Sequence, residues 1–368
     1  MMSGSGHCSL HHACLSAASL ARYAPHAALR PLPAWRRTAA GGWMIEVPVA
    51  PPALPAGSRV VPSLSLGTPL VYDVTFTLRG ERPAAAGGAM PRPERARLQP
   101  LSGEAPPSPV PGDDAPSGGP QPEPVVRAAI DLFEIEAALG TTTLGCELSA
   151  TRALDPREVP ALLTVQVIGP DDPVRPAGDW VRSGGCRETV DVRVAGVPSL
   201  SQMEEASALR ERICAPTSLA MVLRHHGRQV SVASLAALCH HPGHDLYGVW
   251  PMSIRAAARH GCLGYLTVFP DWQPVVTLLA RGVPLVASIA YGAGELDGAA
   301  IPRTTGHLVT LTGVQGDRVL VHDPAAPTRD AVPRTYDLQQ LTAAWLDRHR
   351  IAYVILPLEW LAGVRPRR

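Results

Sequence analysis

The chain has 368 residues, a hydrophobic content of 46% and a formal net charge of +1 from 33 basic and 32 acidic residues. This length predicts about two globular domains, and the balanced charge argues against a nucleic-acid or anionic-membrane partner. Seven cysteines, an odd number spread along the chain, do not form the pattern of a disulfide framework and fit a reducing compartment. No run of about 18 apolar residues occurs, so we expect no transmembrane segment.

The N-terminal stretch has no regular hydrophobic pattern. In residues 1–43, Arg, His and Pro interrupt every apolar run, which leaves no clean hydrophobic region for a secretory signal. We expect this stretch to be a disordered tail, or an extension of a gene model whose true start lies near Met44. The default expectation is a cytoplasmic protein, or a secreted one if the start is placed wrongly.

Residues 44–195 have the features of a β-rich accessory domain, which we interpret as a small β-sandwich. Residues 71–78 alternate apolar and polar side chains, as a half-buried strand does. Residues 82–124 are rich in Pro, Gly, Ala and Ser without hydrophobic periodicity, which predicts a disordered insertion or linker. Further strands are predicted at residues 129–137, 162–168 and 189–194.

Residues 196–361 change in character, because helices come first and strands follow. Helices are predicted at residues 213–227, from Ser231, at 251–260 and at 271–281. Strands are predicted at residues 263–269, 284–291, 307–314, 318–322 and 351–356, with a hairpin turn at Gly316 and Asp317. A helical lobe followed by an antiparallel sheet is an α+β pattern. We expect this domain to fold without the preceding half.

Cys214 lies at the start of the first predicted helix of this domain. Pro216 fits the first helical turn, and Gly227 can end the helix in a left-handed conformation. The unpaired N–H groups of a helix N-terminus favour a thiolate over a thiol, so Cys214 is a candidate nucleophile. A buried structural cysteine at the end of a core helix explains the same residues.

A cysteine nucleophile needs a base from another part of the fold, and the base needs an orienting group. His307 begins a predicted strand, where a polar first residue would lie at the end of a sheet. Asp323 follows the next strand, so hairpin pairing would bring its carboxylate near His307. Alternatively, His307 is a satisfied edge histidine and Asp323 a turn residue before Pro324.

Four motifs over residues 197–357 resemble those of a known family. They are Val-Pro-Ser-Leu-Ser-Gln ending at Gln202, Cys-Ala-Pro-Thr-Ser-Leu-Ala-Met-Val-Leu from Cys214, Gly-His-Leu-Val-Thr-Leu-Thr-Gly from Gly306, and His-Asp-Pro-Ala at 322–325. Together they resemble the papain-like cysteine peptidases related to the double-glycine leader peptidases of bacteriocin exporters, in their stand-alone form. The resemblance predicts the papain-like fold for residues 196–361.

The resemblance implies a cysteine peptidase that hydrolyses peptide bonds through a thioester acyl-enzyme. It implies Cys214 as the nucleophile, His307 as the general base, Asp323 as the orienting carboxylate and Gln202 as the side-chain donor of the oxyanion hole, beside the backbone N–H of Cys214. The substrate would be a peptide or a protein, and we expect neither a cofactor nor a metal. The oligomeric state stays open.

One departure from the family is that Ile213 and Ala215 flank the cysteine where relatives usually have glycines. We expect Ile213 to narrow the approach to the sulfur. The exporters' membrane and nucleotide-binding segments have no counterpart in the sequence, which lacks a phosphate-binding Gly-Lys-Ser/Thr loop.

Three alternatives remain at the level of sequence. An amide transferase or amidase would use the same triad, and a non-catalytic peptide-binding module would keep the fold without the reaction. A zinc site would use the closely spaced Cys and His residues near the second helix, although a core role for Cys239 is simpler. Those residues are Cys239, His240, His241, His244, His260 and Cys262. Trp250, Trp272 and Trp345 are interpreted as core residues or groove walls.

Overall fold

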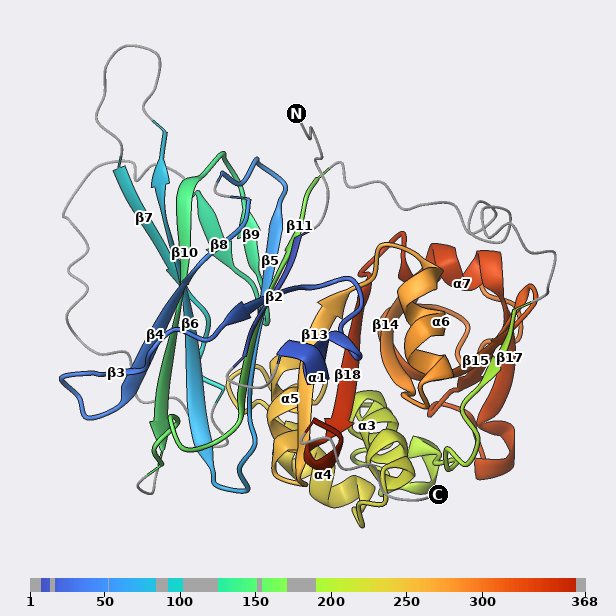
Figure 1. Cartoon of the computed structure of the whole chain (residues 1–368). Coiled ribbons are helices and arrows are strands. Elements are labelled where there is room, and N and C mark those ends of the chain that lie inside the picture. Colours follow the sequence, from blue (N-terminus) through green and yellow to red (C-terminus); the bar gives the residue numbers. More distant parts are fainter. Residues whose placement is uncertain are drawn as a thin grey trace.

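The computed structural model describes residues 8–13, 17–51, 53–83, 92–101, 125–150, 154–170 and 190–361. Two β-sheets from the N-terminal half lie beside a mixed layer of helices and a third sheet from the C-terminal half (Figure 1). This arrangement agrees with the predicted α+β class.

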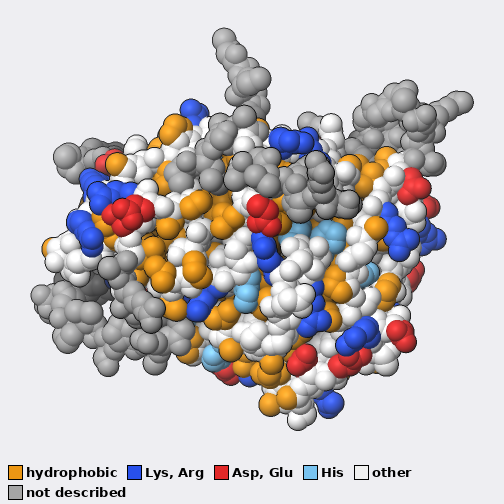
Figure 2. Space-filling view, turned by 60° about the horizontal axis from the view of Figure 1, so that its bottom comes forward, with side chains coloured by type: hydrophobic (Ala, Val, Ile, Leu, Met, Phe, Trp, Pro, Cys, Tyr) orange, Lys and Arg blue, Asp and Glu red, His pale blue; other side chains and the backbone are white. Residues whose placement is uncertain are grey.

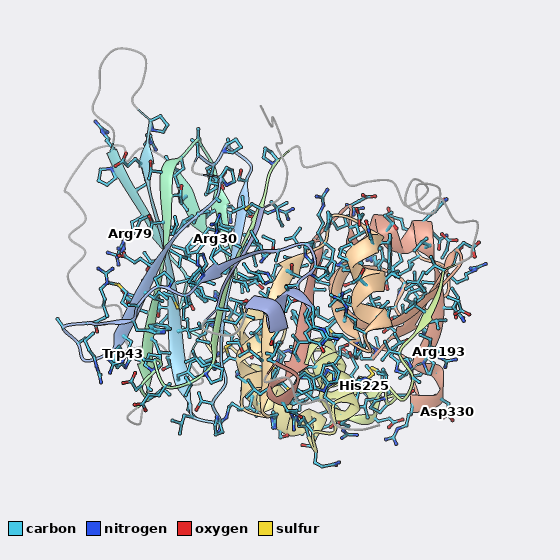
Figure 3. All side chains as sticks on the ribbon, in the orientation of Figure 1. Arg30, Trp43, Arg79, Arg193, His225 and Asp330 are labelled. Atoms are coloured by element: carbon cyan, nitrogen blue, oxygen red, sulfur yellow. The ribbon has the colours of Figure 1, made fainter. Side chains whose placement is uncertain are left out.

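The first two sheets face each other and enclose an apolar core. One has the strand order β2-β1-β11-β5-β9-β8, and the other has the order β3-β4-β10-β6-β7. The strands of the first sheet are β1 Cys8–Ala13, β2 Ala28–Pro31, β5 Arg59–Leu66, β8 Val126–Ala128, β9 Phe133–Ile135 and β11 Ala161–Ile168. Those of the second are β3 Arg36–Arg37, β4 Trp43–Pro48, β6 Tyr72–Arg82, β7 Arg92–Arg97 and β10 Gly140–Ala150. Side chains fill the space between these two sheets (Figure 3).

The alternation predicted at residues 71–78 is present in β6. Tyr72, Val74, Phe76 and Leu78 are all buried in the core between the sheets. The long antiparallel pairing of β6 with β10 places Phe76 opposite Cys146, which is also fully buried. The period-2 pattern therefore identified an interior strand of this sheet correctly, since β6 lies between β10 and β7.

The N-terminal stretch differs from the expected disordered tail over its described residues. β1 pairs antiparallel with β11 along its whole length, and a short helix, α1 Ala17–Ala21, follows. Leu10 lies in the core between the two sheets, whereas Leu20 and Tyr23 pack into the core of the C-terminal half. Non-local pairing orders a segment whose own sequence has no periodicity.

Two further expectations for this half need correction. The expected insertion at residues 82–124 contains strand β7, which pairs with β6, while residues 84–91 and 102–124 lie outside the described residues. The single strand expected at residues 129–137 is a hairpin, because β8 and β9 pair around the loop that carries Asp131.

The third sheet has the order β13-β18-β14-β15-β16-β17, and β12 also pairs with β15. Its strands are β12 Asp191–Arg193, β13 Cys262–Val268, β14 Leu285–Tyr291, β15 Thr304–Gln315, β16 Arg318–His322, β17 Pro333–Asp337 and β18 Ile351–Pro357. The strand predicted at residues 189–194 was assigned to the β-rich half, but β12 belongs to this sheet because Val192 lies opposite Val314. The C-terminal half therefore begins before residue 196, the predicted boundary.

The helices of the C-terminal half are η1 Gln202–Glu204, α3 Cys214–His225, α4 Val232–Cys239, α5 Trp250–Ala258, α6 Trp272–Ala280, η2 Arg329–Ala331, α7 Leu338–Trp345 and α8 Leu358–Leu361. Four of them, α3, α4, α5 and α6, lie within two residues of the predicted bounds, whereas the other helical segments were not predicted. Ser231 caps α4 and Asp271 caps α6 through side-chain hydrogen bonds, and Gly227 ends α3 with φ +78°. In Figure 1, α3, α4 and α5 gather at one end of the third sheet.

The two halves meet along β13, which is an edge strand of the third sheet. Side chains of β5 and β11 supply the partners that an edge strand lacks. Ser65 Oγ accepts a hydrogen bond from Gly264 N at 3.1 Å, Ser63 Oγ accepts one from Leu266 N at 3.2 Å, and Gln166 Oε1 accepts one from Val268 N at 3.3 Å. The halves therefore share a buried boundary instead of meeting through a linker.

The surface carries both signs of charge. On the face drawn in Figure 2, basic and acidic side chains are interspersed, in keeping with the net charge of +1. Across the described ranges, no helix is both long and apolar enough to cross a bilayer.

Candidate active site

Helix α3 places Cys214 at its first residue, and the helix is held against strand β15. Ser218 Oγ, one turn further along, donates a hydrogen bond to Leu308 O at 2.9 Å, and Thr310 Oγ1 donates one to Ser218 O at 3.4 Å. Both polar side chains are fully buried. Since these bonds fix the first turn of α3 beside the start of β15, they bring Cys214 to His307.

His307 and Asp323 form a buried hydrogen-bonded pair. The distance from His307 Nε2 to Asp323 Oδ1 is 2.8 Å, and the two side chains are 3% and 0% exposed. Pairing of Thr310 with His322 in the β15–β16 hairpin sets this geometry, as the sequence predicted. Because Nε2 is used by Asp323, Nδ1 is the ring nitrogen left for the thiol.

The Asp323 carboxylate is satisfied on both oxygens. Oδ1 also accepts a hydrogen bond from Ala325 N at 2.9 Å, and Oδ2 accepts one from the hydroxyl of Tyr336 at 2.7 Å. Such bonds favour the ionised form of a buried carboxyl group. Tyr336, on β17, thus holds the carboxylate from the side opposite the imidazole.

The electrostatics of the three groups favour a thiolate–imidazolium pair. Burial alone would raise the pKa of Cys214, but the hydrogen bond and charge of His307 and the N–H groups of Leu308 and Ala215 lower it below its ordinary value. Burial alone would lower the pKa of His307, but the charge and hydrogen bond of Asp323 dominate and raise it to about 10. The pKa of Asp323 is lowered, since His307 outweighs the effect of burial.

Gln202 lies beside the Asp323 loop, but its side chain does not bond to Cys214. Its backbone N–H donates to Pro324 O at 2.8 Å, and its Nε2 donates to Arg210 O at 2.6 Å. Its Oε1 is buried and has no hydrogen-bond partner among the residues that the structure describes. An amide nitrogen has two N–H groups, so a second donor remains for a ligand.

The residues that flank Cys214 leave the sulfur accessible, contrary to expectation. Ile213 and Ala215 are both fully buried and belong to the apolar core of the C-terminal half. Neither lines the cavity into which Cys214 opens. The expectation that Ile213 narrows the approach to the sulfur was therefore wrong, because its side chain points into the core.

Cys214 is partly exposed and opens into a groove of about 400 Å³. One wall comes from α3 and the residues before it, and another from β14 and β15 around Ser288 and Leu308. The loop before α5 contributes Tyr247, the first residue of α5 is Trp250, and the β8–β9 loop of the N-terminal half contributes Asp131. The groove is thus built from both halves of the chain.

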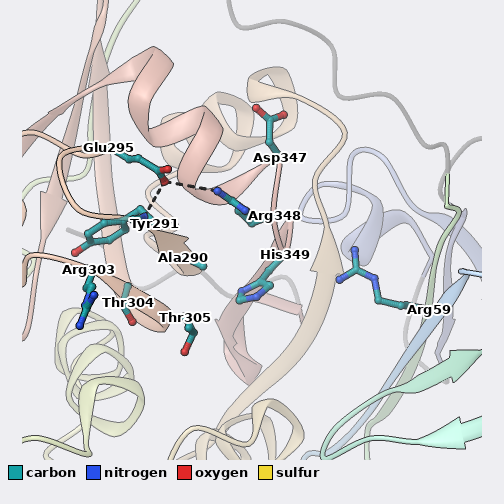
Figure 4. Close-up of a pocket in the computed structure, with 11 residues that line it drawn as sticks. Arg59, Ala290, Tyr291, Glu295, Arg303, Thr304, Thr305, Asp347, Arg348 and His349 are labelled. Carbon is teal, nitrogen blue, oxygen red and sulfur yellow. Dashed lines mark hydrogen bonds and ion pairs between the residues drawn. The ribbon is translucent and has the colours of Figure 1, made fainter.

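A second and larger cavity, of about 920 Å³, adjoins the groove at His349 (Figure 4). It contains three arginines and two acidic residues. These are Arg59, Arg303, Arg348, Glu295 and Asp347. Glu295 pairs with Arg348 at 3.5 Å and accepts a hydrogen bond from Gly292 N. The two cavities share His349 in their linings.

Three residues of the alternative zinc site take other roles. Cys239 and Cys262 are fully buried in the core, and Ser253 Oγ lies 3.9 Å from Cys239 Sγ. His240 pairs with Asp245 at 2.9 Å. Of the tryptophans, Trp250 lines the groove, whereas Trp272 and Trp345 pack against each other in the core. Both interpretations made for the tryptophans hold.

Sequence reasoning missed several groups near Cys214. No element was predicted around Tyr336, although the alternating stretch Arg-Thr-Tyr-Asp is typical of a strand. Asp131 and His349 carry no local motif that would connect them to Cys214. Their place in the groove depends on contacts between distant segments.

Comparisons with known proteins point to one family. Residues 194–353 match the Peptidase_C39 like family, so Gln202, Cys214, His307 and Asp323 all lie within the matched segment. The matched segment is therefore similar to this family over less than half of the chain. A crystal structure from Bacillus anthracis, of a protein assigned to the C39-like peptidases, is 16% identical with a TM-score of 0.36, covering 48% of this chain and 99% of that one. The comparison with curated proteins gave no match.

Proposed function

We propose that the C-terminal half is a cysteine peptidase that hydrolyses peptide bonds with the triad Cys214, His307 and Asp323. The observation that carries this proposal is the position of His307. One ring nitrogen bonds to the buried Asp323 carboxylate at 2.8 Å, and the imidazole lowers the pKa of the Cys214 thiol. A nucleophile, a base and an orienting group in contact are the parts that acyl transfer requires.

In acylation, the Cys214 thiolate forms a bond to the carbonyl carbon of the substrate, and negative charge develops on the carbonyl oxygen. The C–N bond then breaks, and His307 Nδ1 gives its proton to the leaving nitrogen. The amine product departs, and a thioester remains on Cys214. Asp323 stabilises the imidazolium before this transfer and holds the ring in the tautomer that presents Nδ1 to the sulfur.

In deacylation, water attacks the thioester carbon while neutral His307 accepts one of its protons. The C–S bond breaks, and the acid product leaves. The thiolate and the imidazolium are thereby restored. The raised pKa of His307 favours the return of this proton to the ring.

The developing oxyanion needs hydrogen-bond donors. The first backbone N–H groups of a helix lack intrahelical acceptors, so the N–H of Cys214 can serve as one donor. The second N–H of the Gln202 amide is the other proposed donor, with Arg210 O holding the first. Donors of this kind contribute about 10²–10³ to the rate of acyl transfer.

The experiment that tests the function measures release of fluorescent peptides from labelled casein, an unstructured protein substrate. The wild-type chain, Cys214→Ala and the matched control Cys239→Ala are compared. We expect hydrolysis by the wild type and by the control if it folds, and none by Cys214→Ala. Equal hydrolysis by wild type and Cys214→Ala contradicts the proposal.

The same assay separates hydrolysis from transfer, because both would pass through the thioester. Adding an amine acceptor such as hydroxylamine and analysing products by mass gives the fraction transferred. We expect mainly free carboxyl products without the acceptor. Formation of acyl products only when the acceptor is present would favour a transferase instead.

A further inference from the structure

The groove beside Cys214 contains a carboxylate supplied by the N-terminal half. Asp131 lies in the loop between β8 and β9, which is closed by a hydrogen bond from Ala129 N to Leu132 O at 2.9 Å. Its Oδ2 accepts a hydrogen bond from Trp250 N at 3.2 Å, at the start of α5. Because α5 has no side-chain cap of its own, this bond also fixes where Asp131 lies.

Asp131 and Cys214 line the same 400 Å³ cavity. A substrate segment that fills this cavity beside the sulfur would therefore meet the carboxylate. The raised pKa of Tyr353, which is due first to burial, also includes contributions from the charges of Asp131 and Cys214.

Arg212, His349 and Glu211 line the groove with Asp131, and the arginines Arg59, Arg303 and Arg348 line the adjoining cavity. Arg212 pairs with Asp245 at 2.8 Å and lies over the ring of Tyr247, so its charge is already matched. Burial lowers the pKa of His349, which bonds to Ser288 at 3.0 Å. Glu211 adds a second carboxylate to the lining.

Asp131 has no cationic partner of its own. Within the part of the chain that the structure describes, no ion pair involves its carboxylate. Burial raises its pKa to about 6, the direction expected of a carboxylate without a countercharge. A cation from the substrate would supply that charge.

We propose that Asp131 is a specificity-determining residue that selects peptides with a Lys or Arg side chain close to the bond that Cys214 attacks. This inference rests on the proposed function, because it assumes that Cys214 meets peptides in this groove. The N-terminal half is then part of the substrate site. The competing role for Asp131 is that it only holds the start of α5.

The test uses tripeptide chloromethyl ketones, which alkylate Cys214 without any need for turnover. Three matched sets carry Lys, norleucine or Glu at the first, second or third position before the reactive group. The second-order rate of labelling is measured by intact mass at pH 8, where Asp131 is ionised, and the labelled residue is identified by peptide mapping. The proteins are the wild-type chain, Asp131→Asn, Asp131→Ala and the control Asp317→Asn, whose side chain is 83% exposed in a distant hairpin.

We expect the wild type to prefer Lys over norleucine by about tenfold at one position, and to disfavour Glu there. Asp131→Asn keeps an acceptor for Trp250 N but removes the charge, so its Lys-to-norleucine ratio should fall close to one. The control should keep the wild-type ratio. An unchanged ratio in Asp131→Asn, together with a lower melting temperature in Asp131→Ala alone, would overturn the inference and leave Asp131 as a cap of α5.

Failure of the proposed function gives a different result. If iodoacetamide labels Cys214 but no peptide probe labels it faster at any position, the groove does not accept peptides, and both proposals fall. If the peptide probes label Cys214 with saturation but without preference for Lys, only the assignment of Asp131 falls.

Discussion

At Cys214 and His307, burial and charge act in opposite directions. Burial alone would leave both side chains neutral, because it raises the pKa of a thiol and lowers that of an imidazole. Asp323 reverses this balance, since its carboxylate is held ionised by His307, Tyr336 and Ala325. The buried carboxylate thus raises the pKa of His307, and His307, with the N–H groups of Leu308 and Ala215, lowers that of Cys214.

Replacement of Gln202 separates oxyanion stabilisation from activation of the sulfur. Gln202→Ala should lower kcat for casein-derived peptides by about 10²–10³ and leave the iodoacetamide labelling rate of Cys214 within a few-fold, because alkylation forms no oxyanion. Gln202→Glu, which has the same shape but lacks the amide donor, should lose a similar part of kcat. Parallel losses of kcat and of labelling rate would instead mean that Gln202 only supports the Asp323 loop through Pro324.

At the residue scale, the reacting groups could be predicted from the sequence, but the side chains around them could not. Cys214, His307 and Asp323 could be selected because a helix start and a hairpin register are local features. Tyr336 was missed because β17 was not recognised, and Asp131 could not be selected because it reaches Trp250 only after segments more than a hundred residues apart have packed together. The direction in which Ile213 points also depends on packing and was predicted wrongly.

At the scale of elements, capping residues and turn glycines were reliable signals. Ser231, Asp271 and Gly227 mark helix ends in the sequence and mark them in the structure. The pairing of β12 with β15 and the strand at β1 were not predictable, because both are short segments stabilised by partners more than a hundred residues away. Strand β17 and helix α7, which lie between the predicted strands β16 and β18, were not predicted either.

The edge of β13 offers a direct test of how the elements join. Ser65→Ala leaves the buried N–H of Gly264 without its acceptor, and we expect the free energy of unfolding to fall by about 1–3 kcal/mol. Ser63→Ala should act similarly through Leu266. Urea denaturation measures both changes. Ser149→Ala, on an exposed position of β10, is the matched control and should change the free energy by less than about 0.5 kcal/mol. Equal stability in all three variants would mean that the edge is not closed by these side chains.

At the scale of the whole molecule, the two halves share one buried boundary. β11 is buried on both faces, with Leu163 and Val165 in the core between the first two sheets and Leu162 in the core of the C-terminal half. Arg255 of α5 donates a hydrogen bond to Tyr72 O at 2.8 Å across the same boundary. The sequence suggested two separable domains because turn-rich segments lie between them, but turns reveal nothing about which faces pack together.

A chain that begins at residue 190 should therefore not fold as the sequence analysis expected. Without the N-terminal half, β13 would lose the acceptors of three backbone N–H groups, and the C-terminal core would lose Val61 and Leu162. We expect aggregation, or a melting temperature lower by more than about 10 °C than that of the full chain. Circular dichroism and size-exclusion chromatography measure both. A monomeric fragment with a cooperative transition near that of the full chain would contradict this expectation.

The central claim is that His307 activates Cys214 as a thiolate, and the pH dependence of alkylation tests it most directly. A limiting dose of iodoacetamide is applied from pH 5 to 10, and labelling at each cysteine is followed by peptide mapping. Cys8, which is also partly exposed but whose pKa is raised by burial, is the internal reference. His307→Ala is the matched variant.

The lowered pKa of Cys214 means that its thiolate exists at pH values at which an ordinary thiol, with a pKa of about 8.5, is protonated. We predict that Cys214 is labelled before the other cysteines and that its labelling rate reaches half its maximum below about pH 8.5. In His307→Ala, we expect this midpoint to move to higher pH and the labelling rate at pH 7 to fall by about tenfold or more. The claim would be contradicted if the labelling rate of Cys214 increased over the same pH range as that of Cys8 and if His307→Ala left this pH dependence unchanged.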